Sequence, residues 1–430
     1  MSVENIQIGL LGLGTVGRGV YRIITGNAEN IKRKVGVGLE IKKIMVRDTS
    51  RQRGIEIDPG KLTNKVEDIL NDPEIKIVVE VMGGIEPTLD YVSRALENGK
   101  SVVTANKDMI AVYGKQLFAM AEANNADLLF EASVAGGIPI IRPLKQCLSA
   151  NRITQIIGII NGTTNYMLTK MTEEGSDFAD VLREAQAKGY AEADPTSDIE
   201  GYDAARKLAI LASIAFNSRI VLDDVYVEGI TKITAEDIAY AGELNYIVKL
   251  LGIAKETGDG VEVRVHPTLI PRDHPLASVN DVYNAIFVTG DAVGDTMFYG
   301  RGAGEMPTAS AVVADVMDAA RDLLRNVPGL ISCTCYEEKP VKDMGSTESK
   351  YYVRLDVTDR PGVLASIAYA FGDKEVSLAS VLQKQTDGNK AEIVLVTHRV
   401  HEKNMQEALE IIKHLSSVNA VANIIRVEGD

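Results

Sequence analysis

A glycine-rich turn between a predicted strand and a predicted helix constrains this fold more than any other feature. Residues 6–11 form an apolar run typical of a buried strand. The run leads into G-x-G-x-x-G and then a helix-forming segment, the context that gives this motif its weight. The first glycine permits a tight turn, the second admits a pyrophosphate, and the third lets helix and strand pack closely. The sequence therefore predicts dinucleotide binding at Gly12, Leu13, Gly14, Thr15, Val16 and Gly17.

The end of the second predicted strand bears on the choice of nicotinamide cofactor. Residues 39–46 read as that strand, and Arg47 and Asp48 follow it. An acidic residue here usually binds the ribose hydroxyls of NAD, whereas an arginine can pair with the 2′-phosphate of NADP. We therefore favour NADP, and the neighbouring carboxylate leaves NAD open as the alternative.

Strands and helices alternate through the rest of the N-terminal third. Strands are expected at 75–81, 101–104 and 127–130, with helical patterns between them. This alternation is typical of an α/β Rossmann-type fold, a doubly wound parallel sheet that binds ligands at the carboxyl ends of its strands. We expect this nucleotide-binding domain to occupy residues 1–140.

Two polar residues follow one of these strand ends. Thr104 closes the strand and Lys107 lies three residues further on. Because ligands bind at this edge of the sheet, both are candidates for cofactor contact, and Lys107 also for substrate contact. A lysine that merely faces solvent is the alternative reading of Lys107.

The run Ala185–Lys207 crowds carboxylates before the lysine that ends it, Lys207. Asp203 and Lys207 are four residues apart in a helix-forming segment, so they share one helix face. A lysine that must give up a proton benefits from neighbouring carboxylates and from burial. A surface ion pair is the plain alternative, but the apolar run after Lys207 favours a buried helix. The other carboxylates of the run are Glu192, Asp194, Asp198 and Glu200.

Composition excludes several classes of partner. The net charge of −14 disfavours nucleic acid and anionic membranes, and no apolar run reaches the ~18 residues of a membrane span. Three cysteines fit a reducing cytoplasm. Cys333-x-Cys335 could bind metal, but no further Cys or His pair completes a zinc site. All five histidines lie at His266 or beyond, so lysine, tyrosine and carboxylates are left for proton transfer in the first 260 residues.

The carboxylate-rich run resembles the signature of homoserine dehydrogenases. Its pattern is A-x3-G-[aromatic]-A-x2-D-P-x2-D-[aliphatic]-x-G-x-D-x3-K, and the T-x-N-K segment 104–107 and the NGTTN block 161–165 are also similar to that family. Every fixed position of the long pattern is filled: Ala185, Gly189, Tyr190, Ala191, Asp194, Pro195, Asp198, Ile199, Gly201, Asp203 and Lys207.

The resemblance implies an enzyme of the threonine, methionine and isoleucine branch of the aspartate pathway. The reaction would be reversible hydride transfer between NAD(P)H and L-aspartate 4-semialdehyde, giving L-homoserine. In this reading Lys207 donates the proton to the forming alkoxide and Asp203 orients it and the substrate. Glu192 would bind the substrate ammonium, Asp198 would support the site, and Lys107 would help to hold the substrate.

The resemblance also implies further ligands. Gly189 would contact the cofactor, as would Gly304, which lies in an expected glycine-rich turn at 298–304 before a helix at 308–325 that packs back on the nucleotide domain. The segment 131–139 is, on its residues alone, a Gly/Pro turn. The resemblance implies a monovalent cation there, with Na⁺ as the expected ion, held by the Glu131 side chain and the carbonyls of Val134, Gly136 and Ile138.

The C-terminal part is expected to form a separate module. Residues 141–327 read as a mixed β and helical substrate and dimerisation domain, with a strand at 222–230, and 328–349 as a linker. Residues 350–430 follow the order βαββαβ of a ferredoxin-like fold. Their D-R-P-G-V-L turn resembles the ACT domain, which implies an amino-acid effector, with threonine as the choice, at Asp359, Gly362, Val363 and Leu364.

Two other functions stay open on the sequence alone. The first is another nicotinamide-dependent dehydrogenase of small amino or hydroxy acids. Tyr166-x3-Lys170 matches the acid of one such type, the short-chain dehydrogenases, although the glycine pattern differs from that family. A non-catalytic ACT amino-acid sensor is the second alternative. The expected assembly is a homodimer or homotetramer.

Overall fold

A computed structural model describes residues 5–385 and 389–429 and divides the chain into two compact units. The first unit comprises 1–154, 206–222 and 284–338, and the second comprises 155–205, 223–283 and 339–430. Each unit is therefore assembled from segments that are distant in the sequence. Within the described residues, no helix is both long and apolar enough to cross a bilayer.

The first unit is built on a parallel sheet of six strands in the order β3-β2-β1-β4-β5-β6. This is the doubly wound order, and it confirms the predicted Rossmann-type fold. Its central strands are almost fully buried because helices cover both faces. The strands are β1 (Asn5–Leu11), β2 (Gly38–Met45), β3 (Leu62–Thr63), β4 (Ile75–Glu80), β5 (Ser101–Thr104) and β6 (Leu128–Leu129).

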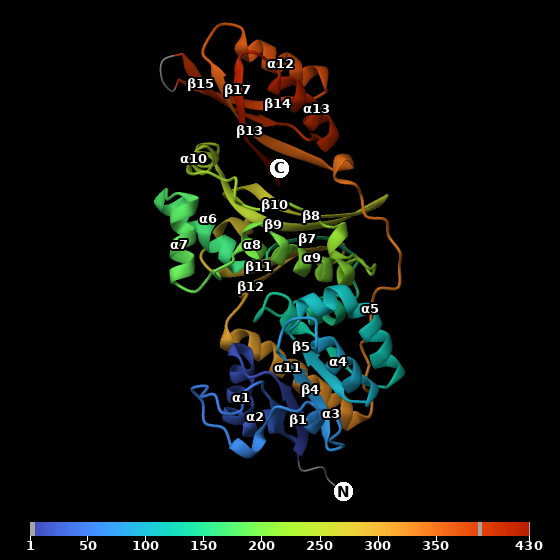
Figure 1. The fold of residues 1–430 in the computed structure, drawn as a ribbon. Helices are drawn as coiled ribbons and strands as arrows, with labels where there is room; N and C mark the ends of the chain where they lie inside the picture. The colour runs from blue at the N-terminus through green and yellow to red at the C-terminus, as the bar shows by residue number, and fades with distance from the viewer. Residues whose placement is uncertain (1–4, 386–388, 430) are drawn as a thin grey trace. The chain divides into compact units, whose positions relative to one another are not determined.

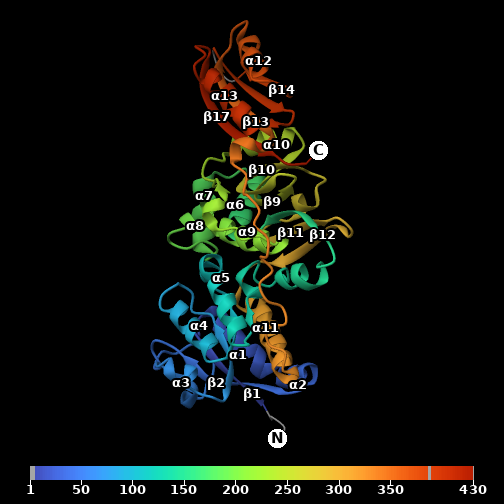
Figure 2. The ribbon, with the colours of Figure 1, turned by 90° about the vertical axis from the view of Figure 1, so that its right-hand side faces the viewer.

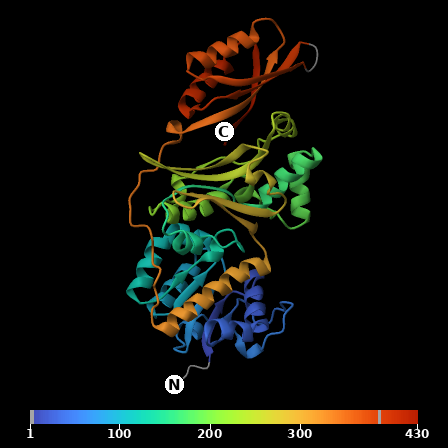
Figure 3. The same ribbon diagram turned by 180° about the vertical axis from the view of Figure 1, so that it is seen from behind.

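Helices of the first unit cover the two faces of this sheet (Figure 2). One face holds α1 (Thr15–Gly26), α2 (Ala28–Val35) and α11 (Glu305–Arg325), and the other holds α3 (Glu67–Leu70), α4 (Thr88–Glu97) and α5 (Lys107–Ala123). The late helix α11 lies against α1 although almost 300 residues separate them (Figure 3). A Cβ at Gly19 would stand 2.7 Å from the Cβ of Ala309, so glycine permits this close packing.

The glycine-rich segment before α11 differs in part from the prediction. Residues 298–301 belong to strand β12 (Gly294–Arg301), which follows β11 (Tyr283–Gly290), so the turn is confined to 302–304. The exposure of residues alternates along β12, and Gly300 occupies an ordinary position in that strand. This glycine therefore does not mark a turn. Gly304 keeps the conformation that requires glycine, with φ of +125°.

The second unit is built on a mixed sheet, with parallel and antiparallel strand pairs. Its strands follow the order β7-β9-β10-β17-β13-β15-β14, with β8 beside β10 and β16 beside β13. The predicted strand at 222–230 is wrong over most of its length, because Leu222–Asp224 form a 3-10 turn and only Tyr226–Val227 (β8) pair. The other strands before the C-terminal module are β7 (Ile153–Ile159), β9 (Tyr246–Thr257) and β10 (Gly260–Pro271).

The helices α6 to α10 accompany this part of the chain (Figure 1). The α6 and α10 helices pack on β9, and α6 also packs on α7 and α8. The α9 helix contains residues of both units. The helices are α6 (Gly162–Glu174), α7 (Phe178–Ala187), α8 (Thr196–Ile199), α9 (Tyr202–Ala215) and α10 (Ala235–Glu243).

The C-terminal module has the predicted βαββαβ order and its own apolar core. Its last strand pairs in parallel with β10, with Thr268 opposite Arg426. The module therefore extends the sheet of the second unit and is not a detached domain. Its elements are β13 (Glu348–Thr358), α12 (Val363–Asp373), β14 (Leu378–Gln385), β15 (Lys390–Thr397), β16 (Val400–His401), α13 (Glu402–Lys413) and β17 (Val418–Val427).

Candidate active site

The glycine turn after β1 has the geometry that a pyrophosphate needs. Gly12 adopts φ of +99°, which permits the tight turn. A Cβ at Gly17 would stand 2.3 Å from the carbonyl oxygen of Gly12, so only glycine lets α1 approach the strand. A Cβ at Gly14 would meet no atom within 4 Å, which leaves this backbone open to a ligand at the N-terminus of α1.

A pocket of about 800 Å³ adjoins this turn and is large enough for a substantial part of a dinucleotide. Leu13 and Thr15 line it with the glycines, and Arg47 and Asp48 stand at its β2 end. The Asp48 carboxylate accepts hydrogen bonds from the backbone N–H and hydroxyl of Ser50, which lower the pKa of Asp48. It is thus engaged by its own loop, whereas Arg47 is exposed.

Three arginines that the sequence did not single out also line this pocket. Arg51 and Arg53 belong to the loop after β2, and the Arg53 guanidinium donates to the backbone carbonyls of Arg51 and Asp48. Arg18 of α1 donates to the carbonyl of Arg53 at 3.3 Å. The pocket end near Arg47 is therefore cationic, which suits an additional phosphate.

Thr104 and Lys107 occupy different environments at the end of β5. The Thr104 hydroxyl is buried, donates to the Glu80 carboxylate and accepts from the backbone N–H of Asn106. Burial raises the pKa of Glu80. The Thr104 side chain is thus committed to the protein interior. Lys107 is half-buried and is the first residue of α5, whose N-cap is Asn106.

An ion pair joins the start of α5 to α9. Arg206 Nε lies 3.1 Å from Asp108 Oδ1. Asp108 follows Lys107, and Arg206 precedes Lys207, so this pair fixes the positions beside both candidate lysines. Lys207 itself is half-buried on α9.

Asn161 holds together two of the predicted carboxylates. Its side-chain amide nitrogen donates to Asp198 Oδ1 at 2.7 Å and to Asp203 Oδ2 at 2.8 Å. Its carbonyl oxygen accepts from the backbone N–H and hydroxyl of Thr164 and thereby caps α6. Asp203 is only 7 % exposed and lies on α9 four residues before Lys207. The fixed carboxylate and the lysine therefore share one face of one helix.

The loop between α7 and α8 carries the remaining residues of the run. Glu192 is exposed, and Gln186 donates to its backbone carbonyl at 3.0 Å. Asp194 accepts from the backbone N–H and hydroxyl of Thr196, the first residue of α8. Gly189 has φ of +74°, and a Cβ there would meet no atom within 4 Å. This loop thus presents the exposed carboxylate of Glu192 and an open glycine backbone.

The geometry does not support the alternative Tyr-x3-Lys acid. The Tyr166 hydroxyl donates to Glu184 at 2.7 Å and accepts from Lys188 at 2.9 Å. Lys170 pairs instead with Glu174 at 2.6 Å. Burial raises the pKa of Tyr166. A short-chain dehydrogenase reaction needs the lysine to lower the pKa of this phenol, and Lys170 does not face it in this way.

Glu131 acts as an anchor for the segment that follows it. Its carboxylate accepts from the backbone N–H groups of Ile140 at 2.6 Å, Ile141 at 2.8 Å and Arg142 at 2.8 Å. These bonds use three of about four lone-pair positions. The backbone between is kinked, with positive φ at Ala135 and Gly136.

The kinked segment also packs against the turn before α11. The Gly137 N–H donates to the carbonyl of Arg301 at 3.1 Å, and a Cβ at Gly136 would stand 2.3 Å from the carbonyl oxygen of Gly302. The two predicted glycine turns thus support each other, and Gly304 follows as the N-cap of α11. One carboxylate position and a kinked backbone fit an oxygen-bound cation only in part.

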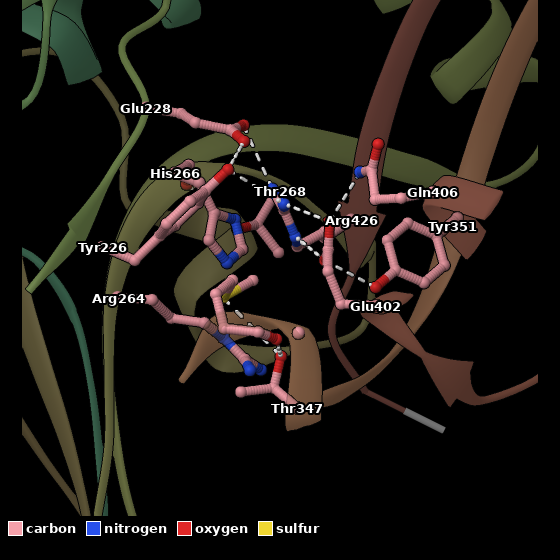
Figure 4. Close-up of polar contacts among 12 residues, drawn as sticks. Tyr226, Glu228, Arg264, His266, Thr268, Thr347, Tyr351, Glu402, Gln406 and Arg426 are labelled. Atoms are coloured by element: carbon pink, nitrogen blue, oxygen red, sulfur yellow. Dashed lines mark hydrogen bonds and ion pairs between the residues drawn. The ribbon is translucent and has the colours of Figure 1, made fainter. Parts of the chain in front are cut away.

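A buried ion-pair cluster joins the C-terminal module to the sheet of the second unit (Figure 4). Arg426 of β17 donates through Nε and Nη2 to Glu402 of α13, each at 2.9 Å, and through Nη1 to Glu228 at 3.0 Å. Glu402 also accepts from the Tyr351 hydroxyl at 2.7 Å. Tyr226 of β8 completes the contact, and its hydroxyl accepts from Arg426.

A second contact joins β13 to α10. Arg354 donates to Asp237 Oδ1 at 2.7 Å and to Thr234 Oγ1 at 3.1 Å, and Asp237 is fully buried. Neither contact is predictable from the sequence, because charged residues on strands carry no signal of their distant partners.

The D-R-P-G-V-L turn opens α12. Gly362 is the N-cap with φ of +88°, and Val363 is buried while Leu364 is 38 % exposed. The backbone N–H of Asp359 donates to the carbonyl of Asn389. The turn therefore offers backbone groups at a helix N-terminus, which suit a carboxylate ligand.

The sheet order and the glycine turn together define the chemical class. A doubly wound sheet binds its dinucleotide where the strand order reverses, which here is the β1 end that holds the pocket. The lysine and carboxylate of α9 can move a proton while a dinucleotide exchanges the hydride. The protein is an NAD(P)-dependent oxidoreductase.

Comparison with known proteins narrows the class to one family. Residues 12–131 match the homoserine dehydrogenase NAD-binding domain, 139–317 match homoserine dehydrogenase, and 351–416 match the ACT domain. The Bacillus subtilis homoserine dehydrogenase is 46% identical over 430 residues, covering 100% of this chain and 99% of that protein. The chain belongs to the homoserine dehydrogenase family and has its activity.

Two solved structures extend the comparison. A homoserine dehydrogenase from Thiobacillus denitrificans has a TM-score of 0.93 and 45% identity, covering 99% of this chain and 98% of that one. A hyperthermophilic archaeal homoserine dehydrogenase in complex with NADPH has a TM-score of 0.62 and 29% identity, covering 73% of this chain and 97% of that one.

Proposed function

We propose that Lys207 is the proton donor in the reduction of L-aspartate 4-semialdehyde to L-homoserine. The observation that carries this assignment is Asp203, fixed by Asn161 on the same face of α9 and one helical turn from Lys207. The Lys207 ammonium gives its proton to the carbonyl oxygen as that oxygen becomes an alkoxide, and takes one from the homoserine hydroxyl in the reverse direction.

The other residues bind and orient the substrate. Asp203 holds the reacting end and the lysine, Asp198 supports it through Asn161, and Lys107 neutralises developing negative charge. Glu192 has an exposed carboxylate that pairs with the substrate ammonium. The bound nicotinamide cofactor supplies the hydride in reduction and accepts it in oxidation.

The cofactor is NADP in this proposal. Arg47 is exposed at the pocket, Arg51 also lines it, and the carboxylate of Asp48 is occupied by Ser50. A 2′-phosphate therefore meets positive charge, whereas a ribose diol finds no free acid here. The NADPH complex of the archaeal relative supports this choice. The Gly189 and Gly304 backbones would contact the same cofactor.

The remaining ligands are proposals of the same kind. Glu131, with the carbonyls of Val134, Gly136 and Ile138, would hold Na⁺ and stiffen the kinked segment. An amino acid, with threonine as the first choice, would bind the module at Asp359, Gly362, Val363 and Leu364. The assembly would be a homodimer or homotetramer, and a cytoplasmic location fits its free cysteines.

The test is nicotinamide absorbance with L-homoserine and either NADP or NAD. We expect Lys207→Ala to abolish turnover with the dissociation constant of NADPH, measured by fluorescence, close to wild type. Lys170→Ala is the matched control, because it removes a different helical lysine, one that pairs with Glu174 four residues away. Turnover within about tenfold of wild type in Lys207→Ala, a barrier change of about 1.4 kcal/mol, would overturn the assignment.

A further inference from the structure

Two thiols line a small cavity in the first unit, apart from the residues assigned above. The cavity has a volume of about 20 Å³, enough for one water-sized group by comparison with the ~10–15 Å³ that a water requires. Cys333 and Cys335 face it from the segment after α11, and both are partly exposed. Ile210 and Ile214 of α9 provide an apolar wall.

Positive charge is concentrated on the same cavity. Arg219 Nη2 donates to Cys333 Sγ at 3.7 Å, and its Nε is buried without a hydrogen-bond partner among the described residues. Lys145 Nζ lies 5.0 Å from the ring centre of Phe118 and 5.4 Å from that of Phe130, on the cavity wall. Two cations beside a thiol favour its thiolate form.

The two thiols divide the roles of anion and donor between them. The Cys335 thiol can donate to Cys333 Sγ, and this contact, with the charges of Arg219 and Lys145, lowers the pKa of Cys333 to about 5. The same contact raises the pKa of Cys335. Cys335 Sγ also lies 3.6 Å from the carbonyl oxygen of Ser213, a second acceptor for its proton. One sulfur is thus nucleophilic while its neighbour stays protonated.

We propose that Cys333 and Cys335 form an oxidative modification site, with Cys333 as the reactive thiolate, Cys335 as the resolving thiol and a hydroperoxide as the oxidant. The Cys333 sulfur attacks one peroxide oxygen and the O–O bond breaks, giving a sulfenic acid and hydroxide. The Cys335 sulfur then attacks the sulfenic sulfur, forming the S–S bond and displacing hydroxide, which leaves as water with the Cys335 proton.

Charge argues for a thiolate nucleophile here and against a metal-binding dithiol. A bound metal cation would meet Arg219 and Lys145 on the same cavity wall. Within the described residues, no group of three or more Cys, His, Asp or Glu side chains is arranged to hold a metal ion. The proposal is independent of the dehydrogenase assignment, because none of its residues is placed in the catalytic or cofactor site.

The first test is the pH dependence of alkylation of the intact protein by iodoacetamide, followed by peptide mass spectrometry. An ordinary thiol, with a pKa of about 8.5, loses reactivity roughly tenfold per pH unit below that value. We expect the alkylation rate of Cys333 to change less than about threefold between about pH 6 and pH 8. A loss of about tenfold per pH unit at Cys333 would overturn the proposal.

The second test uses hydrogen peroxide with dimedone as the sulfenic acid trap. Trypsin releases both thiols in one peptide, Asn326 to Lys342, because Lys339 precedes a proline. We expect this peptide to lose two hydrogen atoms in the wild type, and Cys335→Ser to yield a dimedone adduct on Cys333. Wild-type protein that keeps both thiols reduced while Cys147 is oxidised would refute the assignment.

Arg219→Gln separates the electrostatic argument from a folding defect. We expect this variant to react with peroxide at least about tenfold more slowly than wild type near pH 6. Near pH 9, where an ordinary thiol is largely ionised, its rate should approach that of wild type. A variant that is equally fast at both pH values, or that does not recover near pH 9, would contradict the role given to Arg219.

Discussion

Arg206 and Asp108 form an ion pair of 3.1 Å between α9 and the start of α5. Their chain neighbours are Lys207 and Lys107, so the pair connects two lysines that are far apart in the sequence. Its side chains are 30% and 41% exposed, and a pair of this kind contributes at most about 1 kcal/mol to stability. We therefore expect the ion pair to affect the enzyme by holding the two lysines in position, and not by stabilising the fold.

Asp108→Ala is predicted to lower kcat by about tenfold or more with little change in thermal stability. The reason is that small displacements of a catalytic group are costly in rate. Steady-state kinetics and a thermal melt measure the two effects. Asp90→Ala, which removes the exposed partner of Arg94 in α4, serves as the control and should leave both unchanged. An unaltered kcat in Asp108→Ala would show that the pair does not position the lysines.

Asn161→Asp tests the two bonds that Asn161 donates. Aspartate caps a helix as well as asparagine does, so α6 keeps its cap while a third carboxylate replaces the amide facing Asp198 and Asp203. The like charges raise the pKa values of these carboxylates in the folded state. We therefore expect Asn161→Asp to lose more stability than Asn161→Ala near pH 8.

The pH dependence of that loss has a definite sign. Folded Asn161→Asp binds more protons than its unfolded chain, so its free energy of unfolding relative to wild type rises as the pH falls from about 8 to 5. Urea unfolding at both pH values measures this difference. If Asn161→Asp stays as stable as wild type near pH 8, the side chain of residue 161 does not face the two carboxylates.

The fold was predictable where local pattern and tertiary structure agree. The glycines after β1 specify a turn that only glycine can form, and Asn161 follows a strand and begins a helix as an N-cap. The ACT module was predictable because each of its strands and helices has a clear spacing of apolar residues and is bounded by a recognisable turn. Candidate side chains on α9 were predictable because four residues along a helix always return to the same face.

Other features depend on contacts that no local pattern encodes. Strand β9 was missed because its central Lys249 is polar in the sequence, yet this lysine is buried and donates to the carbonyl of Val279 at 2.6 Å. Arg47 of the cofactor pocket was predicted, but Arg51 and Arg53 were missed because the loop after β2 is shaped by Arg53 bonding to backbone carbonyls. The pairing of β17 with β10 joins Arg426 to Thr268, and no sequence signal marks that register.

The buried Asp315 on α11 should make the stability of the folded protein depend on pH. Burial, followed by the charge of Glu131, raises its pKa to about 7 from an ordinary value of 3.8, although Arg142 donates to it at 2.8 Å. Between about pH 4 and pH 7 the folded protein therefore binds more protons than the unfolded chain. The contribution of Asp315 to the free energy of unfolding therefore falls as the pH rises through this window and is level above it.

Asp315→Asn should remove that slope. Relative to wild type, the variant should gain stability on the order of 2–4 kcal/mol between about pH 4 and pH 7, from about 1.4 kcal/mol per pKa unit. Urea unfolding across this range measures the gain. Asp318→Asn is the control, because Asp318 contacts the same Arg142 at 2.8 Å from a partly exposed position. Parallel curves for Asp315→Asn and wild type would show that Asp315 is ionised throughout.

The last prediction concerns the ion pair of Arg426 and Glu402, where the C-terminal module joins the sheet of the second unit (Figure 4). Both side chains are 6% exposed. Burial alone would raise the pKa of Glu402, but the Arg426 guanidinium lowers it below its usual value, so Glu402 is ionised at neutral pH. Arg426→Met leaves this carboxylate buried without its cation and should cost about 3–5 kcal/mol of unfolding free energy.

A second substitution distinguishes the buried charge from lost packing. Arg426→Met combined with Glu402→Gln removes the unpaired charge while the amide oxygen still accepts from Tyr351, so the double variant should be more stable than Arg426→Met alone. Lys413→Met, which removes an exposed pair with Glu410, should cost less than about 1 kcal/mol. Urea unfolding measures all three. A double variant as unstable as Arg426→Met would mean that packing by the arginine stem, and not charge pairing, joins the C-terminal module to the sheet.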